Sequence, residues 1–251
     1  MASATVEVAR PDDAHEAAVL ADAKRAEYER YSPVFWRPAH DALGRHEPWL
    51  AKCLADEGFT SFTARRGGEL AGIVMAGHTV FPPPFRSDAE PSWLVDDFFV
   101  QSADDWASVG TLLLDAVEDA ARELGATRLV VLTARWDEPK RSMLAVRGYE
   151  RGASWWVHPV EANEGEPPRL LDTDAVVGPA PPVYDPGGLT ALALEMREPA
   201  DVPTFDEWAS ASNAVLAIVP ARSSNIELED ALAKGGYEPA SDWFLKNVRP
   251  V

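Results

Sequence analysis

The residues whose types and spacing could do chemistry lie mostly between positions 93 and 160. An apolar, aromatic run of strand length, residues 93–100, carries two adjacent carboxylates, Asp96 and Asp97. The polar connection after it, residues 101–110, contains small residues that would let a ligand approach: Ala107, Ser108 and Gly110. Unpaired amides at the start of a helix suit phosphate groups. The pattern therefore indicates a site for a phosphate-containing ligand at the end of this strand.

The elements that must position these residues alternate between strand and helix. After the connection, apolar residues recur at spacings of three and four, and they predict a helix through Val109, Leu112, Leu113, Ala116, Val117, Ala120, Ala121 and Leu124. Gly125 would end this helix with a left-handed cap. A strand at 128–133, a short helix from about Pro139 to Gly148, and a strand at 154–158 follow.

This arrangement resembles the GNAT family of acyl-CoA-dependent N-acetyltransferases, over about residues 5–160. The family's donor-loop pattern is Val-x-Pro, then Arg or Gln, two residues, Gly, one residue, and Gly or Ala. Those places hold Val100, Ser102, Asp105, Ser108 and Gly110. Only Val100 and Gly110 match in type, and Asp105 puts a carboxylate where the family has a basic or amide side chain. Asp104 adds a second carboxylate at this point.

The family's later pattern is an Asn, a Tyr seven positions on, and Gly-Phe four positions after that. In this chain Asp137, Leu144 and Gly148-Tyr149 occupy those places. The Gly-aromatic end matches, whereas the Tyr that protonates the leaving thiolate in many relatives is replaced by Leu144.

The resemblance implies an α/β (α+β, GNAT-like) fold with a mixed, mostly antiparallel central sheet and flanking helices. It also implies an N-acetyltransferase that moves an acetyl group from acetyl-CoA to a small amine by direct attack. The pantetheine arm would lie where strands 93–100 and 128–133 splay. The implied cofactor-binding residues are Phe98, Phe99 and Val100, whose amides would steady the oxyanion, and Ser108, Val109, Gly110 and Thr111, which would face the pyrophosphate.

Such a reaction needs a base, because a lysine-like ammonium with a pKa near 10.4 is mostly protonated at neutral pH. Asp96 and Asp97 are the candidate catalytic residues. Adjacent strand residues point to opposite faces, so we expect at most one of them to reach the pocket directly. Asp97 shares the side of Phe99, but the sequence does not choose between the two carboxylates. The alternative is that both cap or pair locally.

Three residues are candidates for substrate binding: Trp36, His78 and Phe85. Trp36 and Phe85 would line an amine pocket, with burial in an aromatic core as the alternative. His78 would relay a proton, with a hydrogen-bonded structural histidine as the alternative. The other histidines show no ligand spacing with one another or with Cys53, so we expect no metal.

Composition narrows the expected partners and location. The 251 residues include 23 basic and 41 acidic ones, and the net charge of -18 would repel nucleic acid and anionic membranes. One cysteine excludes an internal disulfide and fits a reducing compartment. The amino terminus has no basic segment followed by an apolar run, and no apolar stretch approaches the roughly 20 residues needed to span a bilayer. We therefore expect a cytoplasmic protein.

The end of the chain repeats the middle. Ala134-Arg135 and Gly148-Tyr149-Glu150 are echoed by Ala221-Arg222 and Gly236-Tyr237-Glu238, at offsets of 87 and 88, and Trp155 is echoed by Trp243. We predict a GNAT-like domain at 1–160, a Pro-rich linker at 161–188, and a truncated GNAT-like half-domain at 189–251. Only residues 197–213 are available for the donor turn and helix of the copy, against 101–127 in the first unit, so the copy is expected to lack a donor site.

The sequence leaves two questions open. The copy would complete a sheet, shape the acceptor pocket or form a homodimer surface. The alternative to an enzyme is a non-catalytic GNAT-fold protein that has lost donor binding and acts as a binding or assembly module.

Overall fold

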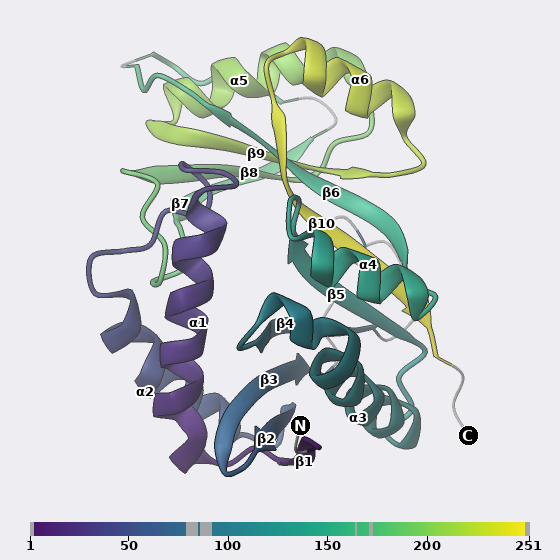
Figure 1. Cartoon of the computed structure of the whole chain (residues 1–251). Coiled ribbons are helices and arrows are strands. Elements are labelled where there is room, and N and C mark those ends of the chain that lie inside the picture. Colours follow the sequence, from purple (N-terminus) through teal and green to yellow (C-terminus); the bar gives the residue numbers. More distant parts are fainter. Residues whose placement is uncertain (1–2, 79–84, 86–91, 164, 171–172, 249–251) are drawn as a thin grey trace.

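The computed structural model describes residues 3–78, 85, 92–163, 165–170 and 173–248, and these residues form one ten-stranded sheet flanked by helices (Figure 1). The first half of the chain contains β1 (Thr5–Val8), α1 (Ala14–Glu29), α2 (Ala42–Leu54), β2 (Phe59–Arg66), β3 (Glu69–Gly77), β4 (Ser92–Val100), α3 (Thr111–Glu123), β5 (Arg128–Ala134), α4 (Glu138–Val146) and β6 (Glu150–Pro159). The second half contains β7 (Asp174–Pro179), β8 (Leu189–Glu195), α5 (Val202–Ala211), β9 (Ala214–Arg222), α6 (Ile226–Lys234) and β10 (Glu238–Asn247).

The strand order is β1-β2-β3-β4-β5-β10-β6-β9-β8-β7. Strands β4 and β5 run parallel, as do β8 and β9, and the other neighbouring strands are antiparallel. The expected mixed, mostly antiparallel sheet with flanking helices is therefore confirmed.

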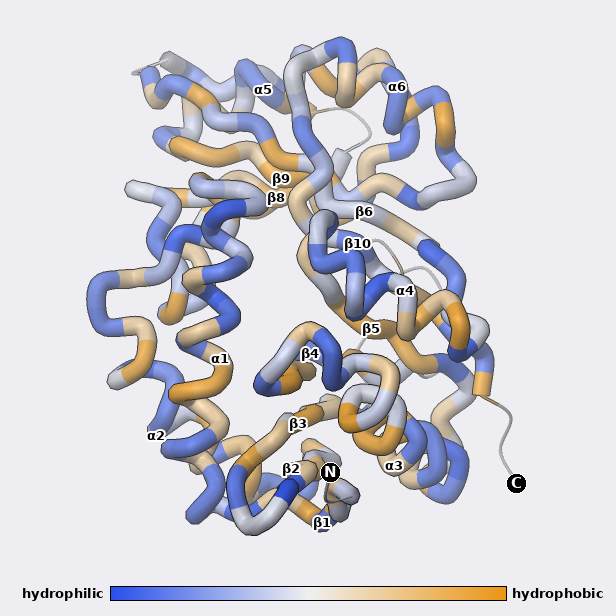
Figure 2. The backbone as a smooth tube through the Cα atoms, in the orientation of Figure 1, coloured by the Kyte–Doolittle hydropathy of each residue, from blue (hydrophilic) through white to orange (hydrophobic). Residues whose placement is uncertain are grey.

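Helices cover both faces of the first half of the sheet. Strand alternation sends one set of side chains to α1 and α2, namely Ile73, Met75 and Phe99. The opposite set packs against α3 and α4, namely Val74, Phe98 and Val100. Figure 1 shows α1 and α2 on one side of these strands and α3 and α4 on the other. Figure 2 shows hydrophobic colour along stretches of β5, near the middle of the view, and of β9, in its upper part.

The second half repeats the first at an offset of 88 residues. Trp243 of β10 lies opposite Leu132 of β5, and Trp155 of β6 lies opposite Pro220 of β9, so each residue of the second pair is related to one of the first by this offset. The offset of 87 suggested by Ala221-Arg222 is one residue short of this register. Ser154 lies opposite Asp242, its own equivalent in the second half, so a pseudo-two-fold axis passes between these two residues.

The two halves exchange their last strands. β10 of the second half lies between β5 and β6 of the first half, and β6 lies between β10 and β9. In each half, the sheet edge that the half's own last strand would cover is covered by the last strand of the other half. Neither half therefore forms a complete sheet by itself. Of the three roles left open for the copy, completion of the sheet is thus present in the structure. The predicted boundaries at 160 and 189 divide the sequence into units, whereas strands from both sides of these boundaries belong to one sheet.

The segment predicted to be a linker contains a strand. β7 pairs with β8 and ends at Pro179, and Val176 and Val177 lie within it. Prolines stand at its end and beyond, where a missing backbone donor does not interrupt the ladder. The composition of residues 161–188 hid this strand because prolines and acids surround it.

Matching caps start α4 and α6. Asp137 accepts from the amide of Lys140, and Asn225 Oδ1 accepts from the amide of Leu228 at 3.1 Å. Asn225 Nδ2 also donates to the carbonyl of Arg197 at 3.0 Å.

We predict that Asn225→Ala lowers the free energy of unfolding by about 1 kcal/mol, the usual loss for a helix N-cap. Urea denaturation measures this change. The control is Ser224→Ala, at the exposed neighbouring position, which should stay within about 0.5 kcal/mol of the parent. Equal stabilities of the two variants would contradict the capping role.

Candidate active site

Strands β4 and β5 diverge at the point where the sequence predicted a splay. Their pairing runs from Ser92 opposite Arg128 to Val95 opposite Val131. β4 continues to Val100, while β5 pairs with β10 along its other edge. The β5-facing edge of β4 beyond Val95 is therefore free of strand partners among the described residues.

A β-bulge in β4 places both carboxylates at this opening. Val74 pairs with Phe98 and Ala76 pairs with Val95, so two steps along β3 match three steps along β4. An extra residue of this kind redirects side chains. As a result Asp96 and Asp97 both line one pocket of about 260 Å³. Strict alternation therefore fails at this smaller pocket, whereas only Asp96 also lines the larger cavity described below. The expectation that at most one of them reaches the acceptor pocket stays a prediction.

Asp97 is held by a histidine from α2. Arg25 Nη2 contacts His46 Nδ1, and His46 Nε2 lies 3.3 Å from Asp97 Oδ2. Arginine offers only donors, so Nδ1 accepts and the ring proton on Nε2 is donated to Asp97. The chain Arg25–His46–Asp97 thus fixes the orientation of this carboxylate.

Asp96 is not held in this way. No described residue forms a hydrogen bond or an ion pair with it. Asp96 is an exposed residue that faces the two pockets that it lines. Desolvation by the protein around these pockets, with repulsion from Asp97, raises the pKa of Asp96 to about 7, while Lys140 opposes the shift. A carboxyl group of this kind can exchange a proton near neutral pH.

A larger cavity, called here the central cavity, adjoins the carboxylate of Asp96. Its volume is about 380 Å³, and its walls include Trp36, Trp155, Tyr184, Ile218 and Trp243 beside Asp96. Trp155 and Trp243 stack with ring centroids 5.1 Å apart, and they are equivalent residues of the two exchanged strands. The second half of the chain therefore also shapes this cavity, in addition to completing the sheet.

Tyr184 is a cavity residue that sequence reasoning missed. It lies in the predicted linker, which crosses to Pro38 in an isolated bridge, and its ring meets Trp36 edge-on at 5.4 Å. Burial raises the pKa of the Tyr184 hydroxyl, and Arg25 opposes this shift. An aromatic residue within a Pro-rich stretch was the only sequence signal.

Two of the predicted substrate residues lie elsewhere. His78 Nε2 is 2.6 Å from Thr60 Oγ1, and the ring stacks on Trp93 at 4.2 Å. Phe85 packs with Val130 and Trp243 under the Arg222 guanidinium. Neither is among the residues that line the central cavity. The structure thus brings Trp36 and Asp96 to the central cavity and Asp96 and Asp97 to the smaller pocket, and His78 and Phe85 line neither.

The predicted donor turn is helical. Residues Ala103–Asp105 form a 3-10 turn and Trp106–Gly110 a π turn, and these lead directly into α3. The amide of Thr111 already bonds to the carbonyl of Trp106. Gly110 is required by packing, because a Cβ there would lie 2.6 Å from Cε3 of Trp106. Of the other predicted residues, Ser108 is exposed and Val109 is buried.

The acidic pair does not cap this helix. Asp105 pairs with Arg66 of β2, with Nη2 and Oδ1 2.6 Å apart, and the Ser102 hydroxyl accepts from the amide of Asp104. Asp105 makes no side-chain hydrogen bond to the helix that it precedes. The corner is therefore not closed by carboxylates.

Lys140 of α4 reaches the open end of β4 instead. Its side chain is only 1% exposed, and Nζ donates to the carbonyl of Phe98 at 3.1 Å. The ammonium lies 5.1 Å from the ring centre of Phe98 and 5.4 Å from that of Trp106. Burial lowers the pKa of Lys140 to about 8, against the attraction of Asp137, Asp96 and Asp97. Lys140 and Trp106 thus fill the space between the start of α3 and α4.

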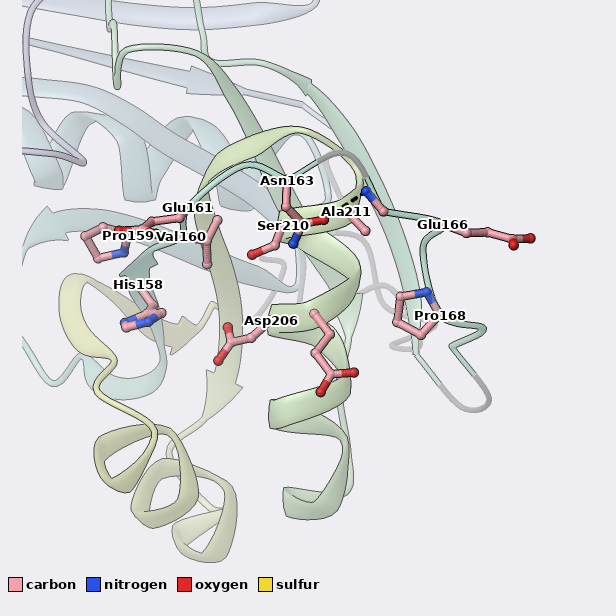
Figure 3. Close-up of a pocket in the computed structure, with 12 residues that line it drawn as sticks. His158, Pro159, Val160, Glu161, Asn163, Glu166, Pro168, Asp206, Ser210 and Ala211 are labelled. Atoms are coloured by element: carbon pink, nitrogen blue, oxygen red, sulfur yellow. Dashed lines mark hydrogen bonds between the residues drawn. The ribbon is translucent and has the colours of Figure 1, made fainter.

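Another hollow lies on the second half and is acidic. Figure 3 shows His158 of β6 and Asp206 of α5 facing it, and its other acidic residues are Glu161, Glu166 and Glu207. A diphosphate would meet like charge there. The helix that precedes β9 is also short, since α5 has 10 residues and α3 has 13. Absence of a donor site from the copy stays a prediction.

Among the residues that the structure describes, no group of three or more His, Cys, Asp or Glu side chains could hold a metal ion. None of the helices in this described part of the chain combines the length and apolarity needed to cross a membrane.

Comparison with known proteins defines the class. The profile of the acetyltransferase (GNAT) family matches residues 21–149, which is just over half of the chain. The chain therefore belongs to the GNAT acetyltransferase family. No curated protein sequence matches the chain significantly.

Several solved structures resemble this chain, and the first described here, with a TM-score above 0.5, shares its fold. A proposed acetyltransferase from Thermoplasma acidophilum is 12% identical with a TM-score of 0.60, and the match covers 97% of this chain and 99% of that one. A tandem GNAT protein from the clavulanic acid biosynthesis pathway is 12% identical with a TM-score of 0.47, over 99% and 100% of the two chains. An acetyltransferase predicted in Clostridium acetobutylicum, solved with acetyl-CoA, is 12% identical with a TM-score of 0.47, over 59% and 90%.

Proposed function

We propose that this chain is an N-acetyltransferase that uses acetyl-CoA to acetylate a small amine. The observation that carries the proposal is the position of Asp96. It is a carboxylate without a hydrogen-bonding partner among the described residues, at the start of the splay between β4 and β5, and it opens onto the central cavity. Family membership supports acetyl-CoA as the donor. A cytoplasmic location remains part of the proposal, and a homodimer remains a prediction.

Asp96 acts in this proposal as the base. It takes one proton from the ammonium in the central cavity, and the freed amine attacks the thioester carbonyl at the open end of β4. Backbone amides within Phe98–Val100 hold the carbonyl oxygen as it gains charge. The C–S bond then breaks and the thiolate leaves, while the new amide nitrogen loses its second proton to solvent. A thiol has a pKa near 8.5, so its thiolate leaves without an acid at Leu144.

Asp97 positions the site rather than touching the amine. The carboxylate of Asp97 accepts a hydrogen bond from His46, and repulsion between the two carboxylates contributes to the raised pKa of Asp96. This division of roles follows from their partners, because Asp97 has one and Asp96 has none among the described residues.

One observation favours the second candidate, a non-catalytic member of the family. Lys140 and Trp106 lie where the family resemblance puts the pantetheine arm, and Met143 Cε stands 3.6 Å from the Cβ position of Gly110. A donor can enter only if Lys140 leaves the carbonyl of Phe98. A protein in which this side chain never leaves would keep the fold without the reaction.

We predict that Lys140→Ala tightens acetyl-CoA binding. A hydrogen bond from a charged group contributes about 1.5–3 kcal/mol, so removing the need to break it should lower the Kd about tenfold or more. Isothermal titration calorimetry measures the change. The control is Ser142→Ala, at an exposed position of the same helix. An unchanged Kd for Lys140→Ala would show that the donor does not enter past Lys140.

The proposed function itself is tested by mixing the protein with acetyl-CoA and a panel of primary amines. Free thiol is followed with a chromogenic disulfide and the acetylated amine by mass spectrometry. Amine-dependent thiol release is expected. Acetyl-CoA binding without any transfer, or no binding at millimolar donor, would favour the non-catalytic candidate.

A further inference from the structure

Resting on the proposed function, we infer that the acceptor is a primary amine with a single positive charge and a compact apolar body, such as an arylalkylamine, bound in the central cavity. The ammonium would lie at Asp96, and the apolar body would lie among the aromatic rings of both halves.

The charge pattern of the central cavity supports this assignment. Asp96 is the one charged side chain among the described residues that line it. The rest of the wall is mainly aromatic and aliphatic, including Leu94, Leu132, Leu216 and Ile218. A site of this composition can neutralise one ammonium and bury an uncharged body.

The aromatic walls suit a cation attached to a flat or branched apolar group. Phe35 meets Trp36 edge-on at 4.6 Å and Trp155 at 6.1 Å, and Tyr184 closes the side next to Trp36. Ring faces attract an ammonium, with a contribution of about 0.5–2 kcal/mol that grows with desolvation. The volume of about 380 Å³ lies near the lower end of the roughly 300–1,000 Å³ of small-molecule sites. The cavity therefore favours a body of about one ring.

The same walls disfavour other amines. A polyamine would bury a second ammonium against Leu216 and Ile218, and an amino acid would bring a carboxylate close to Asp96. Either charge would be buried without a partner, which is costly. The arginines of the neighbouring small pocket already have partners, since Arg25 pairs with Asp22 and Arg45 donates to the carbonyl of Pro182.

Both halves of the chain are needed for this cavity. Trp243 arrives on β10 only because the last strands are exchanged, and Ile218 comes from β9. The inference therefore gives the shortened copy a role in choosing the acceptor. It predicts that a substitution in the second half, remote in sequence from Asp96, changes amine binding.

The experiment measures direct binding of four compounds to the full chain without acetyl-CoA, by tryptophan fluorescence and calorimetry. They are 2-phenylethylamine, 2-phenylethanol, phenylalanine and putrescine. We expect 2-phenylethylamine to bind at least tenfold more tightly than each of the others. Asp96→Asn should remove the preference for the amine over the alcohol while the alcohol still binds.

Ile218→Phe should fill the cavity and weaken 2-phenylethylamine at least tenfold. Ile226→Phe is the matched control, because Ile226 is 67% exposed on α6; it should bind like the parent. Unfolding temperatures show whether each variant folds. If Ile218→Phe does not fold, the relative affinity of Asp96→Asn for 2-phenylethylamine and 2-phenylethanol tests the inference. Equal binding of the amine and the alcohol by the parent, or tighter binding of putrescine or phenylalanine, would overturn the inference.

Transfer assays separate this inference from the proposed function. Selective binding of 2-phenylethylamine without acetyl transfer would refute the proposed function and leave the central cavity as a site for a singly charged apolar amine. Faster acetylation of putrescine or phenylalanine than of 2-phenylethylamine would overturn the inference and leave the transferase in place.

Discussion

Replacing Asp242 with alanine is expected to lower the free energy of unfolding by about 3 kcal/mol. Asp242 is fully buried at the pseudo-two-fold axis, where it accepts from Arg135 Nη1 at 2.9 Å, Arg141 Nε at 3.1 Å and Ser154 Oγ at 2.7 Å. Breaking a buried ion pair by removing one partner costs about 3–5 kcal/mol. The lower end applies because both arginines are partly exposed.

Urea denaturation of the full chain measures this loss. Ser154→Ala is the matched control across the axis, and it should cost less, about 1–2 kcal/mol. It removes the bond that Ser154 donates to Asp242 and the bond that it accepts from Arg151, and it leaves both arginines on Asp242. Because β10 pairs with strands of the first half and β6 pairs with strands of the second half, the two halves should still unfold together. A loss below about 1 kcal/mol for Asp242→Ala would contradict a central role for this cluster.

The second large effect is expected at the proposed base. Asp96→Asn should lower kcat by about 10²–10⁴-fold, the usual contribution of a positioned base, while binding of acetyl-CoA is kept. Asp96 must be ionised to accept a proton, and its pKa is raised to about 7. The rate of the parent should therefore rise as the pH increases through 7, and this rise should be absent in the variant.

Steady-state rates from pH 5.5 to 9 measure this effect. Asp97→Asn is the comparison, because its partner is His46 and it acts through Asp96. It should shift the midpoint of the rise downward, since it removes the repulsion that helps to raise the pKa of Asp96. A parent-like profile for Asp96→Asn would remove Asp96 as the base.

Much of the fold could be predicted from local pattern. The run at 93–100 is β4, the predicted cap Gly125 has φ of 79°, and Gly148 closes α4 with the same φ. The periodicity of hydrophobic residues and the glycines that end helices in a left-handed conformation are local properties, so they can be recognised in a single sequence. The repeat at 88 residues was also visible, through Trp155 and Trp243.

The exchange of strands was not predictable in this way. Whether β10 pairs with β9 or with β5 depends on contacts between residues more than 100 positions apart, such as Arg135 with Asp242. The bulge at Asp96 was equally hidden, because no glycine or proline marks it. The position of Tyr184 in the wall of the central cavity and the contact of His46 with Asp97 depend on the packing of α1, α2 and the linker over the sheet. These features assemble the candidate site, and they depend on tertiary contacts that local sequence patterns do not reveal.

The most direct test of the account is a comparison of the parent and Asp96→Asn in a single assay of amine acetylation at saturating acetyl-CoA, followed by mass spectrometry. The account predicts that the parent converts 2-phenylethylamine to its acetamide, and that the variant does so at least about 100-fold more slowly. Equal rates in the two proteins would contradict the role of Asp96. A parent that forms no acetamide from any amine in the panel would contradict the transferase.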